Sequence, residues 1–133
     1  MTYDDLLENF ACLTDWEDKY RYLIELGDAL PAFSEADKTP AHFVAGCQSQ
    51  VWLTHRREGD AHFFNATGDA HIVRGLAAIL LILVNGKTTA QIQSLDLAEA
   101  FKKLGLLEHL SPMRRNGFTA LIQHIQKLTR ESK

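Results

Sequence analysis

Residues 51–67 read VWLTHRREGDAHFFNAT, and this stretch decides the fold. Val51–Arg57 and Ala61–Thr67 alternate in the way that strands do. Residues 58–60 (EGD) join them as a tight turn, so the stretch predicts an antiparallel hairpin. Because apolar groups fall on both faces of the hairpin, we expect helices on one side and a partly covered surface on the other.

The residues after the hairpin predict a buried helix. From Ala70 to Val84 the sequence is apolar nearly all round, which is typical of a helix at the centre of a core. Asp69 is expected to cap its start, and Asn85-Gly86 to end it.

Five further helices are predicted from caps and apolar stripes. We therefore expect an α+β fold in a single domain, residues 1–133, with helices packed on a small antiparallel sheet and a loop over residues 31–50 before the first strand. The five helices are one with the face Tyr3, Leu6, Leu7 and Phe10; one capped by Thr14 and Glu17 with the stripe Trp16, Tyr20, Leu23, Ile24 and Leu30; two short ones opened by Thr88 with Gln91 and by Asp96 with Glu99; and a last one opened by Ser111-Pro112 with Phe118, Leu121, Ile122, Ile125 and Leu128 inward.

Composition narrows the class of protein. The 133 residues are 46% hydrophobic and 23% charged, as in globular proteins, and the net charge of −3 comes with scattered basic residues. A nucleic-acid surface would need a concentrated cationic patch. The acidic N-terminus is unlike a secretory signal, and the longest apolar run, residues 76–84, is too short to cross a bilayer. We therefore expect a cytoplasmic protein that binds neither nucleic acid nor membrane.

Cys47 is the first candidate for chemistry. It follows Gly46 in the long loop, directly before a strand, and loops on a rigid scaffold often carry reactive groups. A cysteine can also be a small buried hydrophobe. The polar residues 48–50 (QSQ) leave both interpretations of Cys47 open, whereas Cys12, beside Phe10 and Leu13, is interpreted as a core residue.

Other chemistries leave weaker signals in the same sequence. Residues 85–88 (NGKT) end like a phosphate-binding loop, but Leu81 stands where that loop needs glycine. A Cys–His hydrolase stays open, since a histidine could meet Cys47 in space. The histidines show no metal-ligand spacing, so no metal site is expected; they are His42, His55, His62, His71, His109 and His124.

Arg114 and Arg115 fall in the first turn of the last predicted helix, where the helix dipole disfavours cations. Recognition of an acidic partner and simple solvation of the two arginines both remain open. Gly117, within the same helix, is unfavourable there and would permit close approach of another segment.

Four blocks of sequence follow one another from about residue 6 to about residue 127. Together they resemble the SufE/CsdE family of sulfur-acceptor proteins, which implies a single SufE-like domain over residues 1–133. His71 and Met113 depart from the family pattern, and both could alter the surface that a partner meets. The blocks are GCQSQVW at 46–52; WEDKY at 16–20 with LG at 26–27; GDA at 68–70 with IVRGL at 72–76; and HLSPMR at 109–114 with NG at 116–117.

The resemblance implies a function. Cys47 would accept sulfur as a persulfide from a cysteine desulfurase of the SufS or CsdA type, stimulate it, and deliver the sulfur to iron–sulfur cluster assembly, for example to a cluster scaffold. The protein would be a sulfurtransferase-like relay without a cofactor of its own, because pyridoxal phosphate belongs to the desulfurase. A regulator that binds a desulfurase and carries no sulfur is the alternative. A homodimer is left open. The partner-binding residues would be Gly46, Gln48, Ser49, Asp69, Arg114 and Arg115.

The reactivity of Cys47 is expected to depend on the partner. Only a thiolate attacks a persulfide, and the sequence places no cation directly beside the cysteine. The basic groups nearest in sequence are Lys38, His42 and His55. We hypothesise that the loop keeps Cys47 quiet against apolar side chains and presents it when the desulfurase docks.

Overall fold

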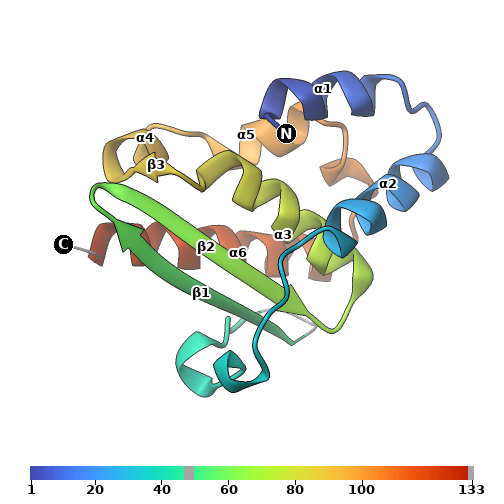
Figure 1. Cartoon of the computed structure of the whole chain (residues 1–133). Coiled ribbons are helices and arrows are strands. Elements are labelled where there is room, and N and C mark those ends of the chain that lie inside the picture. Colours follow the sequence, from blue (N-terminus) through green and yellow to red (C-terminus); the bar gives the residue numbers. More distant parts are fainter. Residues whose placement is uncertain (47–49, 132–133) are drawn as a thin grey trace.

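The computed structural model describes residues 1–46 and 50–131, and a long β-hairpin forms one side of it, with helices α3 (His71–Val84) and α6 (Pro112–Glu131) on its other side (Figure 1). Strands β1 (Val51–Glu58) and β2 (Ala61–Gly68) are antiparallel, and their register places Val51 opposite Gly68. Gly59 opens the two-residue turn with a φ of +58°, which glycine adopts without strain. The predicted hairpin is confirmed.

A third strand, which the sequence did not predict, completes the sheet. Strand β3 (Lys87–Thr88) is antiparallel to β2 and pairs with Ala61 and His62. The sheet order is therefore β1-β2-β3. Two residues are too few for an alternating pattern, so this strand leaves no signal in the sequence.

The two faces of the sheet differ, as expected. Val51 and Leu53 of β1 and Phe64 and Ala66 of β2 are buried on the face that meets the helices. On the opposite face Trp52 and its neighbours are only half-buried. The register that follows from this pattern fixes which side chains of the hairpin enter the core.

Helix α3 (His71–Val84) is buried along most of its length and packs against both β2 and α2 (Trp16–Asp28). The crossing of α2 and α3 depends on glycine. A Cβ on Gly75 would overlap the carbonyl of Leu23, and a Cβ on Gly27 would lie 2.8 Å from the backbone nitrogen of Gly75. The two helix backbones therefore approach more closely than any larger residue allows.

The other helices enclose this centre, and Figure 1 shows α6 passing behind the hairpin. The predicted caps Thr88, Asp96 and Ser111 are confirmed, since each side chain accepts a hydrogen bond from a backbone N–H three residues on. The remaining elements are α1 (Tyr3–Ala11), α4 (Thr89–Gln93), α5 (Leu97–Lys103), α6 (Pro112–Glu131) and three 3₁₀ turns, Glu35–Asp37, Pro40–His42 and Leu107–His109.

Two predicted caps were wrong. Helix α2 begins one residue later than the proposed box of Thr14 and Glu17, with Asp15 at its N-cap and no side-chain cap bond. Helix α3 has Ala70 at its N-cap, so Asp69 lies outside the helix. In both places the predicted cap is a polar residue of a type common at N-caps, but the actual N-cap is the residue that follows it.

Two burial predictions, for Cys12 and Tyr20, also need correction. Cys12 is exposed at the C-cap of α1, because it follows the buried Phe10 by two residues and so faces the other side of the helix. Tyr20 is exposed rather than part of the inner stripe of α2. Leu30 packs against the core as expected, although it lies beyond the end of that helix.

None of the helices in the described part of the chain combines the length and the apolar character needed to cross a membrane.

Candidate functional site

The chain that leads toward Cys47 is fastened to the start of β1. The backbone N–H of Val44 donates to the carbonyl of Val51 at 2.9 Å, and Phe43 forms an isolated β-bridge with Trp52. The rings of Phe43 and Trp52 also meet edge to face, with centroids 6.0 Å apart. Val44 is almost fully buried. The chain entering the cysteine segment is therefore held by a backbone bond, a ring contact and a buried side chain.

Cys47, Gln48 and Ser49 lie outside the described residues, whereas Gly46 and Gln50 on either side of them are described and exposed. Gly46 has a φ of +90°, a conformation that L side chains rarely adopt. A Cβ at this position would also lie 3.1 Å from the Cβ of Ala120 in α6. Glycine at position 46 thus serves both the backbone conformation and the close approach of the loop to α6.

Gln50 is joined to Asp69 by two hydrogen bonds. The Gln50 N–H donates to Oδ1 of Asp69, and the Asp69 N–H donates to the Gln50 carbonyl, each at 3.2 Å. Asp69 is the residue that the sequence placed as a helix cap. It instead connects the end of the cysteine loop to the corner between β2 and α3.

Arg74 reinforces the same corner from the first turns of α3. Its guanidinium donates to the carbonyl of Gly68 at 2.9 Å and to Nδ1 of His71 at 2.6 Å. Because a guanidinium only donates, Nδ1 of His71 must accept. His71, one of the two departures from the family pattern, therefore takes part in holding the corner.

The predicted partner-binding residues fall into two places. Gly46 and Asp69 belong to the two flanks of residues 47–49, since Gly46 precedes them beside Ala120 and Asp69 bonds Gln50, which follows them. Arg115 does not join them, since its Nε donates to the carbonyl of Leu107 at 2.9 Å and five residues along a helix separate it from the Ala120 face. Arg114 lies beside it in the first turn of α6, where its backbone N–H bonds to Ser111. The roles of all four in binding a partner stay predictions.

Two of the three basic groups named from the sequence lie within the loop, ahead of Cys47. Lys38 places its Nζ 5.7 Å from the centroid of the Trp52 ring. His42 has its Nδ1 2.7 Å from the carbonyl oxygen of Asp37. Because a carbonyl only accepts, Nδ1 of His42 carries the proton, and Nε2 of the neutral ring keeps a lone pair.

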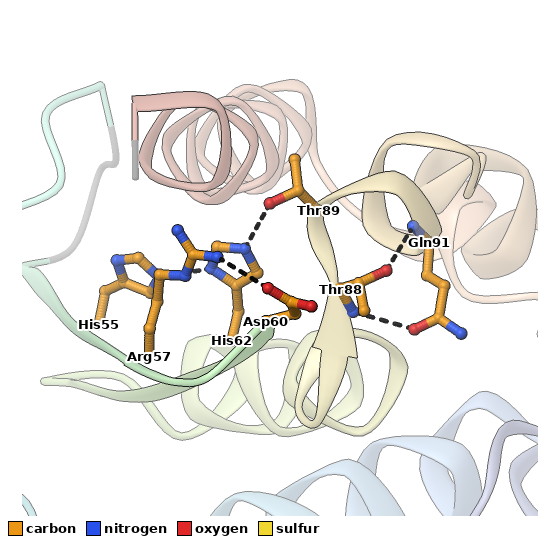
Figure 2. Close-up of polar contacts among 7 residues, drawn as sticks. All are labelled: His55, Arg57, Asp60, His62, Thr88, Thr89 and Gln91. Atoms are coloured by element: carbon orange, nitrogen blue, oxygen red, sulfur yellow. Dashed lines mark hydrogen bonds and ion pairs between the residues drawn. The ribbon is translucent and has the colours of Figure 1, made fainter. Parts of the chain in front are cut away.

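His55, the third basic group, belongs to a network that the sequence analysis missed. Its Nε2 lies 2.8 Å from Nδ1 of His62, and Nε2 of His62 lies 2.7 Å from Oγ1 of Thr89 (Figure 2). His62 is fully buried. Alternation could have indicated this placement, because His55 follows Leu53 by two residues and His62 precedes Phe64 by two, all on the inner face.

Burial lowers the pKa of both His55 and His62 below the usual histidine range, and the nearby Arg57 guanidinium lowers each further. For His55, the charge of His62 lowers the pKa as well. The pair is therefore neutral near pH 7 and forms a polar link between the hairpin and the start of α4. Within residues 1–46 and 50–131, no three His, Cys, Asp or Glu side chains gather as metal ligands would.

The comparison with known families decides the identity of the chain. Residues 4–129 match the SufE family, described as an Fe–S metabolism associated domain. The chain belongs to the SufE family. The resemblance seen in the four sequence blocks is thereby confirmed, and the chain takes its place in a family of sulfur acceptors in iron–sulfur metabolism.

Relatives support the assignment over almost the whole length. An uncharacterized SufE-like protein of Rhizobium etli is 46% identical over 128 residues, covering 93% of this chain and 86% of the relative. Another, of Rhizobium meliloti, is 46% identical over 127 residues, covering 92% and 91%.

A solved structure shares the fold. The solution structure of a hypothetical protein from Thermus thermophilus superimposes with a TM-score of 0.78, covering 98% of this chain and 97% of the other, at 20% identity. The expected α+β class, with helices on a small antiparallel sheet, is therefore confirmed.

Proposed function

We propose that this SufE-family protein accepts sulfur as a persulfide on Cys47 from a pyridoxal-phosphate cysteine desulfurase of the SufS or CsdA type, stimulates that enzyme, and delivers the sulfur to cluster assembly. One observation carries the proposal beyond family membership. Of the exposed residues on either side of 47–49, Gln50 is hydrogen-bonded to Asp69, and Gly46 lies so close to α6 that a Cβ on it would be 3.1 Å from Ala120. A docked partner would thus meet this segment at a fixed corner of the fold.

The transfer step is a thiol exchange. The Cys47 thiol gives up its proton, and its thiolate attacks the outer sulfur of the persulfide on the desulfurase. A new sulfur–sulfur bond forms on Cys47 while the original one breaks. The cysteine of the desulfurase leaves as a thiolate and takes up a proton, so no oxidant or reductant is consumed. Pyridoxal phosphate acts only in the desulfurase, where it releases sulfur from the substrate cysteine.

His42 suits the proton requirement of this step, and Lys38 is a nearby cation whose Nζ is paired with Oε1 of Glu35 at 2.8 Å. Both lie in the segment that leads to Cys47, and the bond to Asp37 leaves Nε2 of His42 as the basic nitrogen of its ring. We propose that docking of the desulfurase brings the thiol into reach of such a base. In the unbound protein the thiol would stay unreactive.

Intact-mass spectrometry tests the acceptor role. After incubation with a desulfurase and cysteine, the wild-type chain should gain about one sulfur mass that a thiol reductant removes. Cys47→Ser should abolish the gain. Cys12→Ser is the matched control, because Cys12 is an exposed thiol on a different element, α1, and its loss should leave the gain unchanged.

Desulfurase stimulation separates the carrier from the regulator. Cys47→Ser should still bind the desulfurase but lose its stimulation of sulfide release. If Cys47→Ser stimulates as well as wild type, the protein is a regulator that carries no sulfur, and the proposal is wrong. A sulfur adduct on Cys12 in place of Cys47 would contradict it equally.

A further inference from the structure

Three cationic side chains from three different helices converge around the turn at Gly105. A Cβ built on Gly105 would lie 3.2 Å from Nζ of Lys19, which extends from α2. Lys102 of α5 and Arg115 of α6 line a hollow of about 440 Å³ together with Gly105, Leu107 and Glu108. The net charge of the chain is −3, so this cluster is not a consequence of general basicity.

The cluster keeps a net positive charge, because Glu108 is the one carboxylate among the described residues that line the hollow. No ion pair joins Lys19, Lys102 or Arg115 to a carboxylate among residues 1–46 and 50–131. Glu108 is largely exposed, and its Oε1 lies 3.7 Å from Nε2 of His109 and 4.0 Å from the Cβ built on Gly105. Converging like charges repel one another, and an anion placed among them would relieve that repulsion.

Arg115 is held in a fixed orientation at this place. Its Nε donates to the carbonyl of Leu107 at 2.9 Å, so the guanidinium is anchored to the 3₁₀ turn while the residue stays exposed to solvent. A guanidinium with one nitrogen anchored still presents further N–H donors, whose geometry matches a carboxylate.

The cationic hollow continues into a second one along α6. Arg115 and Leu107 line both, and the second hollow, of about 330 Å³, runs between α5 and α6. Its lining is apolar and amide in character rather than charged. Besides Arg115 and Leu107, it consists of Ala98, Phe118, Thr119, Ile122, Gln123 and Gln126.

We propose that this continuous groove is a docking surface for an acidic peptide segment of a partner protein. Carboxylates of the segment would lie among Lys19, Lys102 and Arg115, and an apolar side chain would cover Ile122. Amide groups of Gln123 and Gln126 can donate to and accept from the peptide backbone. An elongated groove with a charged end and an apolar continuation fits a peptide better than a small anion, which would occupy the charged end alone.

The groove lies on a different side of α6 from Ala120, the residue that faces Gly46. Arg115 and Ala120 are five residues apart, which at 3.6 residues per turn separates their directions by about 140°. An acidic segment bound in the groove would therefore leave the Gly46 corner accessible. The inference stands independently of the sulfur-acceptor proposal.

Peptide titration tests the inference. The probe is a blocked synthetic peptide with two adjacent glutamates followed by two leucines, and its binding is monitored by heteronuclear NMR of the full chain. Backbone amides of residues 102–107 and 119–126 should shift, and affinity should fall as salt is added. The same peptide with glutamines in place of glutamates should bind more weakly by about tenfold.

Matched variants distinguish the groove from general charge attraction. Lys102→Glu and Arg115→Gln should each weaken binding about tenfold, whereas Lys103→Glu, an exposed neighbour outside the hollow that undergoes the same charge change, should alter it less than about twofold. Arg115→Gln removes a hydrogen bond to Leu107 and could disturb the turn there. Lys102→Glu changes only an exposed residue, so it tests the charge of the groove without that complication. Equal losses from Lys102→Glu and Lys103→Glu would overturn the proposal. So would the absence of peptide binding, or equal affinity for inorganic phosphate with no shifts along residues 119–126.

Discussion

Asp69 and Gln50 hold each other by two hydrogen bonds, one from the Gln50 N–H to the Asp69 carboxylate and one from the Asp69 N–H to the Gln50 carbonyl. The pair joins the end of the cysteine loop to the corner between β2 and α3. Arg74 bonds the adjacent carbonyl of Gly68, so the corner that holds the loop is itself braced from α3. The position of the loop thus depends on contacts between residues that are distant in sequence.

Asp69→Ala should release the end of the loop. The Gln50 amide would lose its side-chain acceptor, so its hydrogen exchange should become faster, while the free energy of unfolding should fall by only about 0.5–1.5 kcal/mol. Alkylation of Cys47 should change in rate together with the exchange. Asp28→Ala, at the exposed end of α2, is the control and should affect neither. Unaltered exchange at Gln50 would show that the carboxylate does not hold the loop.

Gly46→Ala should be destabilising for two separable reasons. The positive φ costs roughly 1–2 kcal/mol for any L side chain, and the new methyl would press on Ala120. Gly59→Ala shares the positive φ but has no atom within 4 Å, so it measures the backbone cost alone. Urea unfolding should show a larger loss in the free energy of unfolding for Gly46→Ala than for Gly59→Ala. Adding Ala120→Gly to Gly46→Ala should remove that difference. Equal losses at the two glycines would mean that the contact with α6 is unimportant.

Gly75→Ala should weaken the crossing of α2 and α3. Alanine normally stabilises a helix relative to glycine by up to about 1 kcal/mol, but here its Cβ would overlap the carbonyl of Leu23 and force the helices apart. We expect a net loss of about 1–3 kcal/mol in the free energy of unfolding. A variant more stable than wild type in thermal unfolding would show that the two helices can separate without cost.

Stability should fall as the pH falls below about 6.5. In the folded chain the pKa values of His55 and His62 are lowered from 6.5, whereas the unfolded chain binds protons at the usual pKa. The unfolded state therefore takes up more protons in this range, and stability is fully present only above it. His124, also lowered by burial, acts in the same sense. The geometry adds a limit, because ring nitrogens 2.8 Å apart cannot both carry protons that face each other.

Urea midpoints measured at pH about 7.5 and about 5.5 test this dependence. His55→Gln should reduce the difference between the two midpoints, and His109→Gln, a change at an exposed histidine, should leave it as in wild type. A midpoint that does not respond to pH in the wild-type chain would contradict the assignment of a neutral pair.

The features that sequence predicted correctly are those set by neighbours along the chain. The hairpin follows from alternation on both sides of Gly59, and α3 follows from its continuous apolar character. The caps at Thr88 and Asp96 are bonds across three residues, which a sequence shows directly.

The features that it missed depend on contacts between distant residues. Asp69 has the appearance of a cap in the sequence because its partner, Gln50, lies nineteen residues away on another segment. The glycines at 27 and 75 look like ordinary helix residues until the helices cross. For the candidate site the sequence supplied the cysteine block and the family, while the fastening of the loop by Val44 and Asp69 came only from the fold.

Strand β2 is the middle strand of the sheet, but β3 covers only Ala61 and His62, and the rest of that side of β2 has a consequence for how other chains can join this one. Side chains engage its outward backbone groups: Asn85 bonds both the N–H and the carbonyl of Phe64, Asn65 accepts from the N–H of Ala66, and Arg74 donates to Gly68. An incoming strand would have to displace these bonds, so sheet extension from molecule to molecule is opposed along this side. Another protein that binds at this side of β2 would contact side chains rather than backbone groups. The same bonds oppose the strand-by-strand growth of fibrils from β2.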